Sequence, residues 1–371
     1  MDFEFTDEQL ALRETARAVL TAACPPAVVR AVFEGTGDGQ ALWARLVELD
    51  WPALGVPPEH GGLGLGFLEV GIVVEELGRV VAPTPFLATA TQLAPVLREA
   101  GSSFLLDDLA GGRCTGTLAL AEGGVWRAEA VATTARRVGD GWVLDGVKSH
   151  VLDGATAAEV AVVARGDAGL GVFVVPGAEV TATVTHVIDP TLPVTTVTLT
   201  GTEVGGERVL VEPGDPAAAR VVERALEEAT TAIALSTVAT CRAIFEVTLQ
   251  HAKDREQFGR PIGSFQALKH RLADCYLAVE RAASLAYFAA LTIAEDDDRR
   301  AVATAMAKAA AGDCQRLLTR DGLQLHGGIG FTWEHDLHFL LKRATAGALL
   351  FGTAATHRAD LARRLGLEAV A

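Results

Sequence analysis

Arg255 begins the segment of this sequence that is best suited to bind a charged ligand. The segment extends to Asp274 and reads REQFGRPIGSFQALKHRLAD. A planar guanidinium can donate two hydrogen bonds to phosphate oxygens, which suits the pyrophosphate group of a dinucleotide. Gly259 and Pro261 should turn the chain after a long helix, and Ser264 is predicted to cap the next helix. We therefore expect Arg255 to contact phosphate.

A glycine-rich run further along the chain has the same potential. It spans Gln324–Gly330 and reads QLHGGIG. Glycines allow backbone N–H groups to approach a phosphate without an intervening side chain, and Gln324 and His326 would border such a site. The alternative interpretation is an ordinary surface arginine in one place and a simple helix end in the other. Two such segments, in order and flanked by helices, favour the binding site.

Together the two segments resemble the flavin-binding signatures of the acyl-CoA dehydrogenase family. Val56–Gly66, which reads VPPEHGGLGLG, also follows the pattern of that family. The resemblance implies that FAD is the cofactor and that these residues serve the FAD of a neighbouring subunit. The cofactor-binding residues that it implies, mainly for the ADP half, are Arg255, Gln257, Phe258, Gln266, Gln324, Leu325, His326, Gly327, Gly328 and Thr353.

The residue that usually acts as the catalytic base in this family is missing. The C-terminal run KRATAGALLFGTAATHR places Phe351 where the family usually carries a glutamate, and phenylalanine cannot accept a proton. Some family members place the base on the long helix before the arginine signature, at a position that corresponds to about Ala229. Glu228 is the neighbouring candidate, although a solvated helix charge is the favoured interpretation of Glu227 and Glu228. The catalytic residue is therefore left unassigned.

The stretches that would hold the flavin ring within the same subunit also depart from the family pattern. Residues 120–124, LAEGG, replace the usual T-E-P-x-x-G-S-D stretch. His150 takes the place of an aromatic residue, and Leu152 takes the place of a hydroxyl residue. A leucine side chain has no donor for the flavin edge, so this departure changes the chemistry of the site.

The departures from the family pattern are one-sided. The elements that would bind the FAD of a neighbouring subunit match the pattern, whereas the chain's own flavin-ring site and catalytic base do not. This pattern resembles the subunit without a catalytic glutamate in α2β2 acyl-CoA dehydrogenases of bacterial sterol side-chain breakdown. The implied function is α,β-desaturation of an acyl-CoA thioester with a related partner subunit, and an electron-transferring flavoprotein is the usual acceptor. Two alternatives stay open: a homodimeric or homotetrameric dehydrogenase or oxidase with a displaced base, and a non-catalytic acyl-CoA-binding or scaffold protein.

The hydrophobic periodicity predicts which elements position these residues. Helical patterns occur from Leu10, over Leu42–Leu49 and over Leu68–Leu77, and Thr6 with Gln9 forms a capping-box pattern. A period of two, typical of strands, holds from about Cys114 to Val211. The remaining predicted helices are Ala218–Lys253, one with an apolar face from Phe265 to Val279, Ala301–Leu325, and His338–Ala362.

These elements predict an α+β fold of the acyl-CoA dehydrogenase type. We expect an N-terminal helical domain over residues 1–112, a middle β domain over residues 113–215, and a C-terminal four-helix bundle over residues 216–371. The resemblance, and not the periodicity, supplies the detailed architecture.

Composition narrows the class of protein further. The net charge of −15 argues against nucleic acid and anionic membrane surfaces as partners, and a site for anionic FAD or CoA must gather local cations. No run of about 18 uncharged apolar residues occurs, so no transmembrane helix is expected. Five scattered cysteines and no signal peptide pattern favour reduced thiols in the cytoplasm. No metal site is expected, because His326, His335 and His338 lack a further ligand of suitable spacing.

Overall fold

The computed structural model describes residues 4–367, which divide into two compact units that interleave along the chain. The helical unit comprises the chain up to Gly39, Phe67–Pro83, and the chain from Thr230 onward. The sheet unit comprises Gln40–Gly66 and Thr84–Ala229. The three domain boundaries expected from the sequence stay predictions. The two units are defined by packing, and each combines segments that are separate in the sequence.

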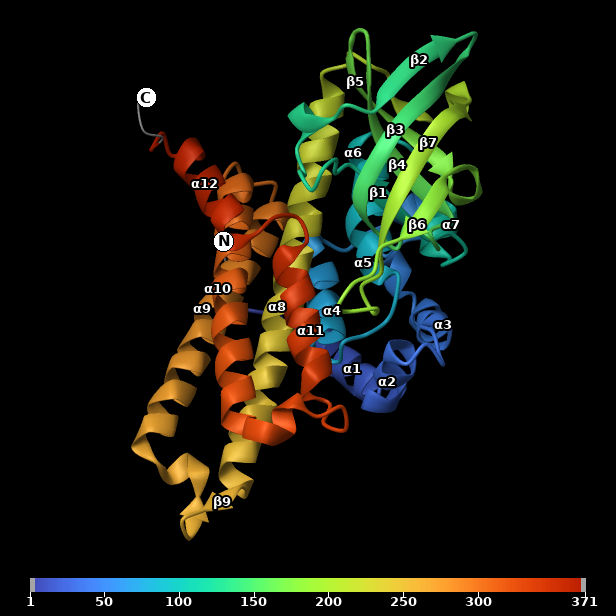
Figure 1. The fold of residues 1–371 in the computed structure, drawn as a ribbon. Helices are drawn as coiled ribbons and strands as arrows, with labels where there is room; N and C mark the ends of the chain where they lie inside the picture. Colours follow the sequence, from blue (N-terminus) through green and yellow to red (C-terminus); the bar gives the residue numbers. More distant parts are fainter. Residues whose placement is uncertain (1–3, 368–371) are drawn as a thin grey trace. The chain divides into compact units, whose positions relative to one another are not determined.

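The helical unit is built mainly from long helices that run side by side (Figure 1). The predicted capping box is confirmed, since the Thr6 Oγ1 accepts from the Gln9 N–H and the Gln9 side chain accepts from the Thr6 N–H. The helices are α1 Asp7–Ala23, α2 Pro26–Phe33, α4 Phe67–Arg79, α9 Gln266–Ala294, α10 Arg300–His326, α11 Leu337–Leu349 and α12 Ala354–Arg364, with α8 Ala217–Asp254 continuing in from the sheet unit.

The sheet unit combines an eight-stranded mixed sheet with short helices. Its strands are β1 Gly116–Ala119, β2 Thr134–Val138, β3 Gly141–Leu152, β4 Glu159–Gly166, β5 Gly169–Pro176, β6 Thr181–Val184, β7 Val194–Val204 and β8 Val209–Val211. The order is β6-β7-β3-β2-β4-β5-β8, with β1 parallel to β4. The short helices are α3 Gln40–Glu48, α5 Phe86–Ala88, α6 Ala94–Glu99 and α7 Leu106–Ala110.

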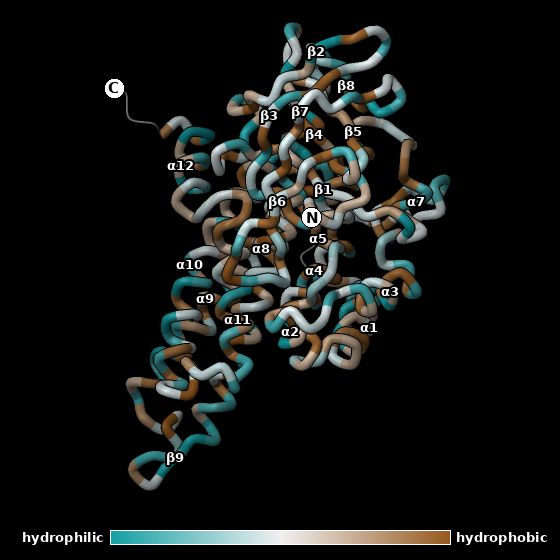
Figure 2. The backbone as a smooth tube through the Cα atoms, turned by 45° about the vertical axis from the view of Figure 1, so that its right-hand side comes forward, coloured by the Kyte–Doolittle hydropathy of each residue, from teal (hydrophilic) through white to brown (hydrophobic). Residues whose placement is uncertain are grey.

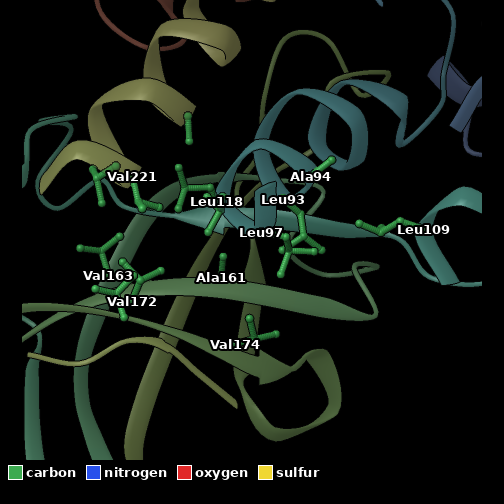
Figure 3. Close-up of a cluster of buried hydrophobic side chains, with 14 of the residues drawn as sticks. Leu93, Ala94, Leu97, Leu109, Leu118, Ala161, Val163, Val172, Val174 and Val221 are labelled. Carbon is green, nitrogen blue, oxygen red and sulfur yellow. The ribbon is translucent and has the colours of Figure 1, made fainter. Parts of the chain in front are cut away.

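A buried apolar cluster joins the sheet to the helices that cover it (Figure 3). Ala161 and Val163 from β4 and Val172 from β5 face Leu97 from α6 and Val221 from the first turns of α8. The alternating strand pattern supplies one apolar face, and the helices supply the other side of the core. The α+β class predicted from the sequence is confirmed, with helices, then strands, then helices in chain order.

Two expectations about helices need correction. The single predicted helix His338–Ala362 is two helices, because the chain is extended at Leu350 and left-handed at Phe351 and Gly352. Two helices, α8 and α9, are long and apolar enough to cross a membrane by length and composition, as is the bent pair α1 and α2 if taken together. In α8, 72% of the most apolar window is buried inside the protein. Figure 2 shows apolar and polar positions alternating along these helices.

Candidate functional site

The first signature forms a tight hairpin at the end of α8. Strands β9 Glu256–Gln257 and β10 Arg260–Pro261 pair, and Phe258 and Gly259 form the two-residue turn between them (Figure 1). Both turn residues are left-handed, with φ of 55° and 76°, which is the combination that a type I′ turn requires. A bulky residue rarely adopts this conformation, so the strain at Phe258 marks a candidate functional position.

The hairpin presents its side chains to solvent, and their contacts are local. The Phe258 and Phe265 rings meet edge-on with centroids 6.1 Å apart, and the Gln257 side chain donates to the Glu256 carbonyl oxygen. Phe258 is 91% exposed. Within residues 4–367, the Arg255 side chain has no hydrogen bond or ion pair, while its backbone is fixed by contacts to His251 and Ile262. Arg260 lies 4.2 Å above the Phe265 ring. A free guanidinium beside an exposed aromatic ring is suited to hold a phosphate and a stacked base.

The structure gathers the local cations that an anionic ligand needs. A hollow of about 410 Å³ at the base of the hairpin is lined partly by Lys253 and Lys269. Gln266 is exposed at the first turn of α9. The predicted cap at Ser264 is wrong: the helix begins after Phe265, and the Ser264 hydroxyl is buried without a hydrogen-bond partner among the described residues.

The second signature occupies the end of α10 and the turn that follows it. Gln324 and Gly328 are exposed, and added Cβ atoms at Gly327 and Gly328 would meet open space. The backbone here is therefore accessible to a ligand, as the sequence predicts. Leu325 and His326 are buried, so they can support the site from behind but cannot offer an open side chain to a ligand. Their assignment as cofactor-binding residues stays a prediction.

Packing between three helices brings the two signatures together. Ala252 near the end of α8, Leu272 on α9 and Leu325 on α10 form one buried apolar cluster. The His251 and His326 rings stack with centroids 4.4 Å apart. Burial lowers the pKa of both imidazoles, and the nearby charge of Arg255 lowers the pKa of His251 further. The neutral, stackable forms are therefore favoured next to the hairpin.

Gln324 also borders a polar hollow of about 650 Å³ between α9 and α10. The charged residues that line this hollow are Arg271, Asp274, Arg320 and Asp321. The buried Asp321 carboxylate pairs with Arg320 at 2.9 Å and with Arg271 at 3.8 Å. The two arginines and two aspartates of this hollow therefore largely offset one another's charge beside Gln324.

The degraded ring-binding stretch is held by a buried ion pair. Lys148 on β3 donates to the Glu122 carboxylate at 2.6 Å, and Thr133 and Ala132 donate to it as well. Burial raises the pKa of Glu122, but the hydrogen bonds from Lys148 and Thr133 outweigh this and lower it to about 2. Burial lowers the pKa of Lys148 to about 8. The backbone of this stretch is thus fixed by its contacts with Lys148, Thr133 and Ala132.

The side chains at the expected flavin edge are unsuitable for the ring. Leu152 is buried in the sheet unit and has no donor to offer. His150 is left-handed, with φ of 54°, and its ring lies 5.2 Å from the Trp126 ring. Asp153 has φ of 56°. Leu152 therefore offers no side-chain donor to a flavin, and the loss of the chain's own ring site stays a prediction.

The turn that carries Phe351 is rigidly held. Lys308 on α10 donates to the carbonyl oxygens of Gly347, Ala348 and Gly352, at 3.1, 2.8 and 2.9 Å. Burial lowers the pKa of Lys308 to about 7, whereas three carbonyl acceptors require the protonated amine. His357 donates to the Phe351 carbonyl oxygen at 2.9 Å. These contacts fix the turn, and the side chain that it carries at position 351 is a phenylalanine.

Thr353 caps α12 at the end of the same turn. Its hydroxyl accepts from the Thr356 N–H at 3.2 Å, and the residue is exposed. The hydroxyl already serves the helix, so its predicted contact with the cofactor stays a prediction.

Glu228 is not the solvated charge favoured by the sequence interpretation. It is buried on α8 and forms an ion pair with Arg98 of α6. Packing within the sheet unit therefore removes the Glu228 carboxylate from water, and Arg98 offsets its charge. A buried ion pair between two packed helices resembles a structural contact more than a general base.

Sequence reasoning missed Lys308 and the Lys148–Glu122 pair. A signal for Lys308 existed, since it occupies a buried face of an alanine-rich helix between Ala303 and Ala311. A lysine on such a face needs acceptors from a neighbouring element. Within residues 4–367 no group of three or more His, Cys, Asp or Glu is arranged to hold a metal.

Comparisons with known proteins agree over most of the chain. Residues 6–105 match the acyl-CoA dehydrogenase N-terminal domain family, and residues 219–366 match the acyl-CoA dehydrogenase C-terminal domain family. The acyl-CoA dehydrogenase IpdE2 of Mycobacterium tuberculosis is 30% identical over 349 residues, which are 93% of this chain and 93% of that protein.

Two heteromeric solved structures are also similar. A chain of the ChsE4–ChsE5 complex from Mycobacterium tuberculosis aligns with a TM-score of 0.90 and 26% identity, over 99% of this chain and 100% of that one. A variant of the steroid ACAD Tcur3481–Tcur3483 aligns with a TM-score of 0.86 and 29% identity, over 97% of this chain and 98% of that one.

Replacing Lys308 should loosen the turn around Phe351. Lys308→Met leaves three buried carbonyl groups without their donor. An unsatisfied buried acceptor costs about 1–3 kcal/mol, so we expect lower stability in urea unfolding and faster hydrogen exchange at residues 348–353. Lys269→Met, at an exposed lysine, is the matched control. Unchanged exchange in this turn would show that Lys308 does not hold it.

Proposed function

This chain belongs to the acyl-CoA dehydrogenase family, and we propose that it acts as the subunit of a heteromer that lends the ADP-binding half of an FAD site to its partner. The partner would supply the flavin-ring pocket and the catalytic base. The observation that carries this proposal is the contrast between the exposed Arg255 side chain, which has no hydrogen bond or ion pair among the described residues, and the phenylalanine at position 351.

The residues present fit one half of FAD and not the other. On the ADP side, Arg255 is free within the described residues, Phe258 is exposed, and Gly327 and Gly328 leave open backbone. On the ring side, Leu152 is buried without a donor. When bound, FAD would supply the acceptor for the β-hydride of an acyl-CoA thioester. This chain would bind and orient the pyrophosphate, while no side chain at position 351 could hold a proton.

The similar proteins support the same proposal. Both the ChsE4–ChsE5 complex and Tcur3481–Tcur3483 pair two different chains, and the latter is a steroid ACAD. We propose a steroid-bearing acyl-CoA as the first substrate to test with the assembled enzyme. An electron-transferring flavoprotein is the proposed acceptor and the cytoplasm the proposed location, both from the resemblance of the sequence to the family.

Flavin content tests the proposal directly. Expressed alone, the chain should be colourless or insoluble, because its own ring site lacks donors. Expressed with a related partner subunit, it should form a complex with one FAD for each pair of unlike chains, measured from the visible spectrum and the protein concentration. A homo-oligomer of this chain that retains one FAD per subunit would overturn the proposal.

Arg255→Ala should weaken retention of FAD by the assembled complex. A charge-assisted bond to phosphate contributes about 1.5–3 kcal/mol, which corresponds to roughly 10- to 100-fold in affinity. Flavin fluorescence after dialysis measures the loss, and circular dichroism checks that the fold is kept. The control is Arg281→Ala, at an exposed arginine of α9. Equal flavin retention in the two variants would mean that Arg255 does not touch the cofactor.

Glu228→Gln separates this proposal from a homo-oligomeric enzyme with a displaced base. If Glu228 is only the structural partner of Arg98, turnover of the assembled complex should stay within a few-fold of the original. Loss of a general base costs about 10²- to 10⁴-fold. Glu223→Gln, at an exposed glutamate of the same helix, is the control. A fall of several orders of magnitude with FAD retained would place the base in this subunit.

A further inference from the structure

A further pocket in the helical unit lies outside both signatures. It has a volume of about 540 Å³ and is formed where α1, α2 and α4 meet α8 and the start of α11. That volume lies in the range of small-molecule sites. Its apolar walls include Val29, Val81, Ala243, Val247, Phe339 and Leu340. We call it the α2–α11 pocket.

The walls of the α2–α11 pocket are fixed before any ligand binds. Arg30 of α2 donates to the Trp333 carbonyl oxygen at 2.9 Å and to the Asp336 carboxylate at 2.6 Å, so the segment before α11 is fastened to α2. The Cys24 thiol donates to the Val80 carbonyl oxygen at 3.8 Å. Val81 is left-handed, with φ of 57°, which is rare for a β-branched residue. A strained residue in a pre-formed wall is typical of a binding site.

Two of the charged groups at the pocket have ion-pair partners. Arg79 donates to the buried Glu76 carboxylate at 3.0 Å and to the Thr21 hydroxyl at 2.8 Å. Arg17 shares that carboxylate, so a positive charge remains at this wall. Asp336 is paired with Arg30. The His335 Nδ1 accepts the Leu337 N–H at 3.1 Å.

Two further carboxylates border the pocket. Glu246 and Glu334 are exposed, and among the described residues neither has an ion-pair partner. Arg17 and Arg242 act on Glu246 at longer range, but their guanidinium groups are bound to Glu76 and Glu280. The pocket therefore combines an apolar interior with a net negative opening.

We propose that the α2–α11 pocket binds a small amphipathic cation, with an aliphatic or aromatic body inside and an ammonium group at Glu246 and Glu334. Apolar surface would supply most of the affinity, and the carboxylates would select the sign of the charge. FAD and acyl-CoA are anions, so this pocket is unsuited to both. The proposal goes beyond the proposed function and does not depend on it.

Three probes with the same eight-carbon tail test the charge selection. Isothermal titration with n-octylammonium, n-octanol and n-octanoate should give the tightest binding for the cation and the weakest for the anion. Glu246→Gln and Glu334→Gln should each weaken n-octylammonium binding roughly 3- to 10-fold at low salt, with little effect on n-octanol. Glu203→Gln, at an exposed glutamate of the sheet unit, is the control.

A filled pocket tests the location. Val247 is 38% exposed at the pocket, so Val247→Trp should fold while occupying part of the apolar volume. We expect it to abolish n-octylammonium binding with an unchanged Tm. The proposal is overturned if n-octanoate binds as tightly as n-octylammonium, if none of the probes binds, or if the folded Val247→Trp protein binds as the original does. Flavin content is unaffected by any of these outcomes, so they leave the proposed function separately testable.

Discussion

The candidate cofactor site depends on one apolar contact between three helices. Ala252, Leu272 and Leu325 pack together, and the stacked imidazoles of His251 and His326 extend this contact toward the hairpin. Because these residues belong to α8, α9 and α10, the contact fixes the base of the Arg255 hairpin beside the end of α10. Two segments that are far apart in sequence thereby lie beside each other. The base of the hairpin is held firmly, while the Arg255 side chain forms no hydrogen bond or ion pair among the described residues.

The residues that fix the backbone around the expected active site differ from those that would carry out its chemistry. The turn after α11 is still held by Lys308, and the stretch before β2 is still held by the Lys148–Glu122 pair. Both frameworks would suit a functional site, yet Phe351 and Leu152 carry no groups for it. Framework residues are buried and hydrogen-bonded, so their loss would destabilise the fold. Residues that served only catalysis are free to change without that cost.

Most of the fold could be predicted because periodicity and capping residues report directly on local structure. Thr6 and Gln9 mark the start of α1, and the apolar spacing finds α8 and α10 within one residue at each end, whereas it marks only the first half of α9. The break at Leu350–Gly352 was missed because Lys308, distant in sequence, stabilises it through backbone carbonyl groups. Glu228 was misjudged for a similar reason, since its partner Arg98 lies on another helix. The assignment of Arg255 and Gln324 to a ligand site rests on glycines and their spacing, which need no tertiary information, and it stays a prediction.

The exposed Phe258 has a consequence for the life of the chain before assembly. A strained aromatic residue at the tip of a hairpin, beside uncompensated cations, is the kind of surface that chaperones and proteases recognise in unassembled subunits. Under the proposed function, that surface is covered only when the partner binds. The cellular level of this chain would then follow the supply of its partner, and surplus copies would be removed without a dedicated regulator.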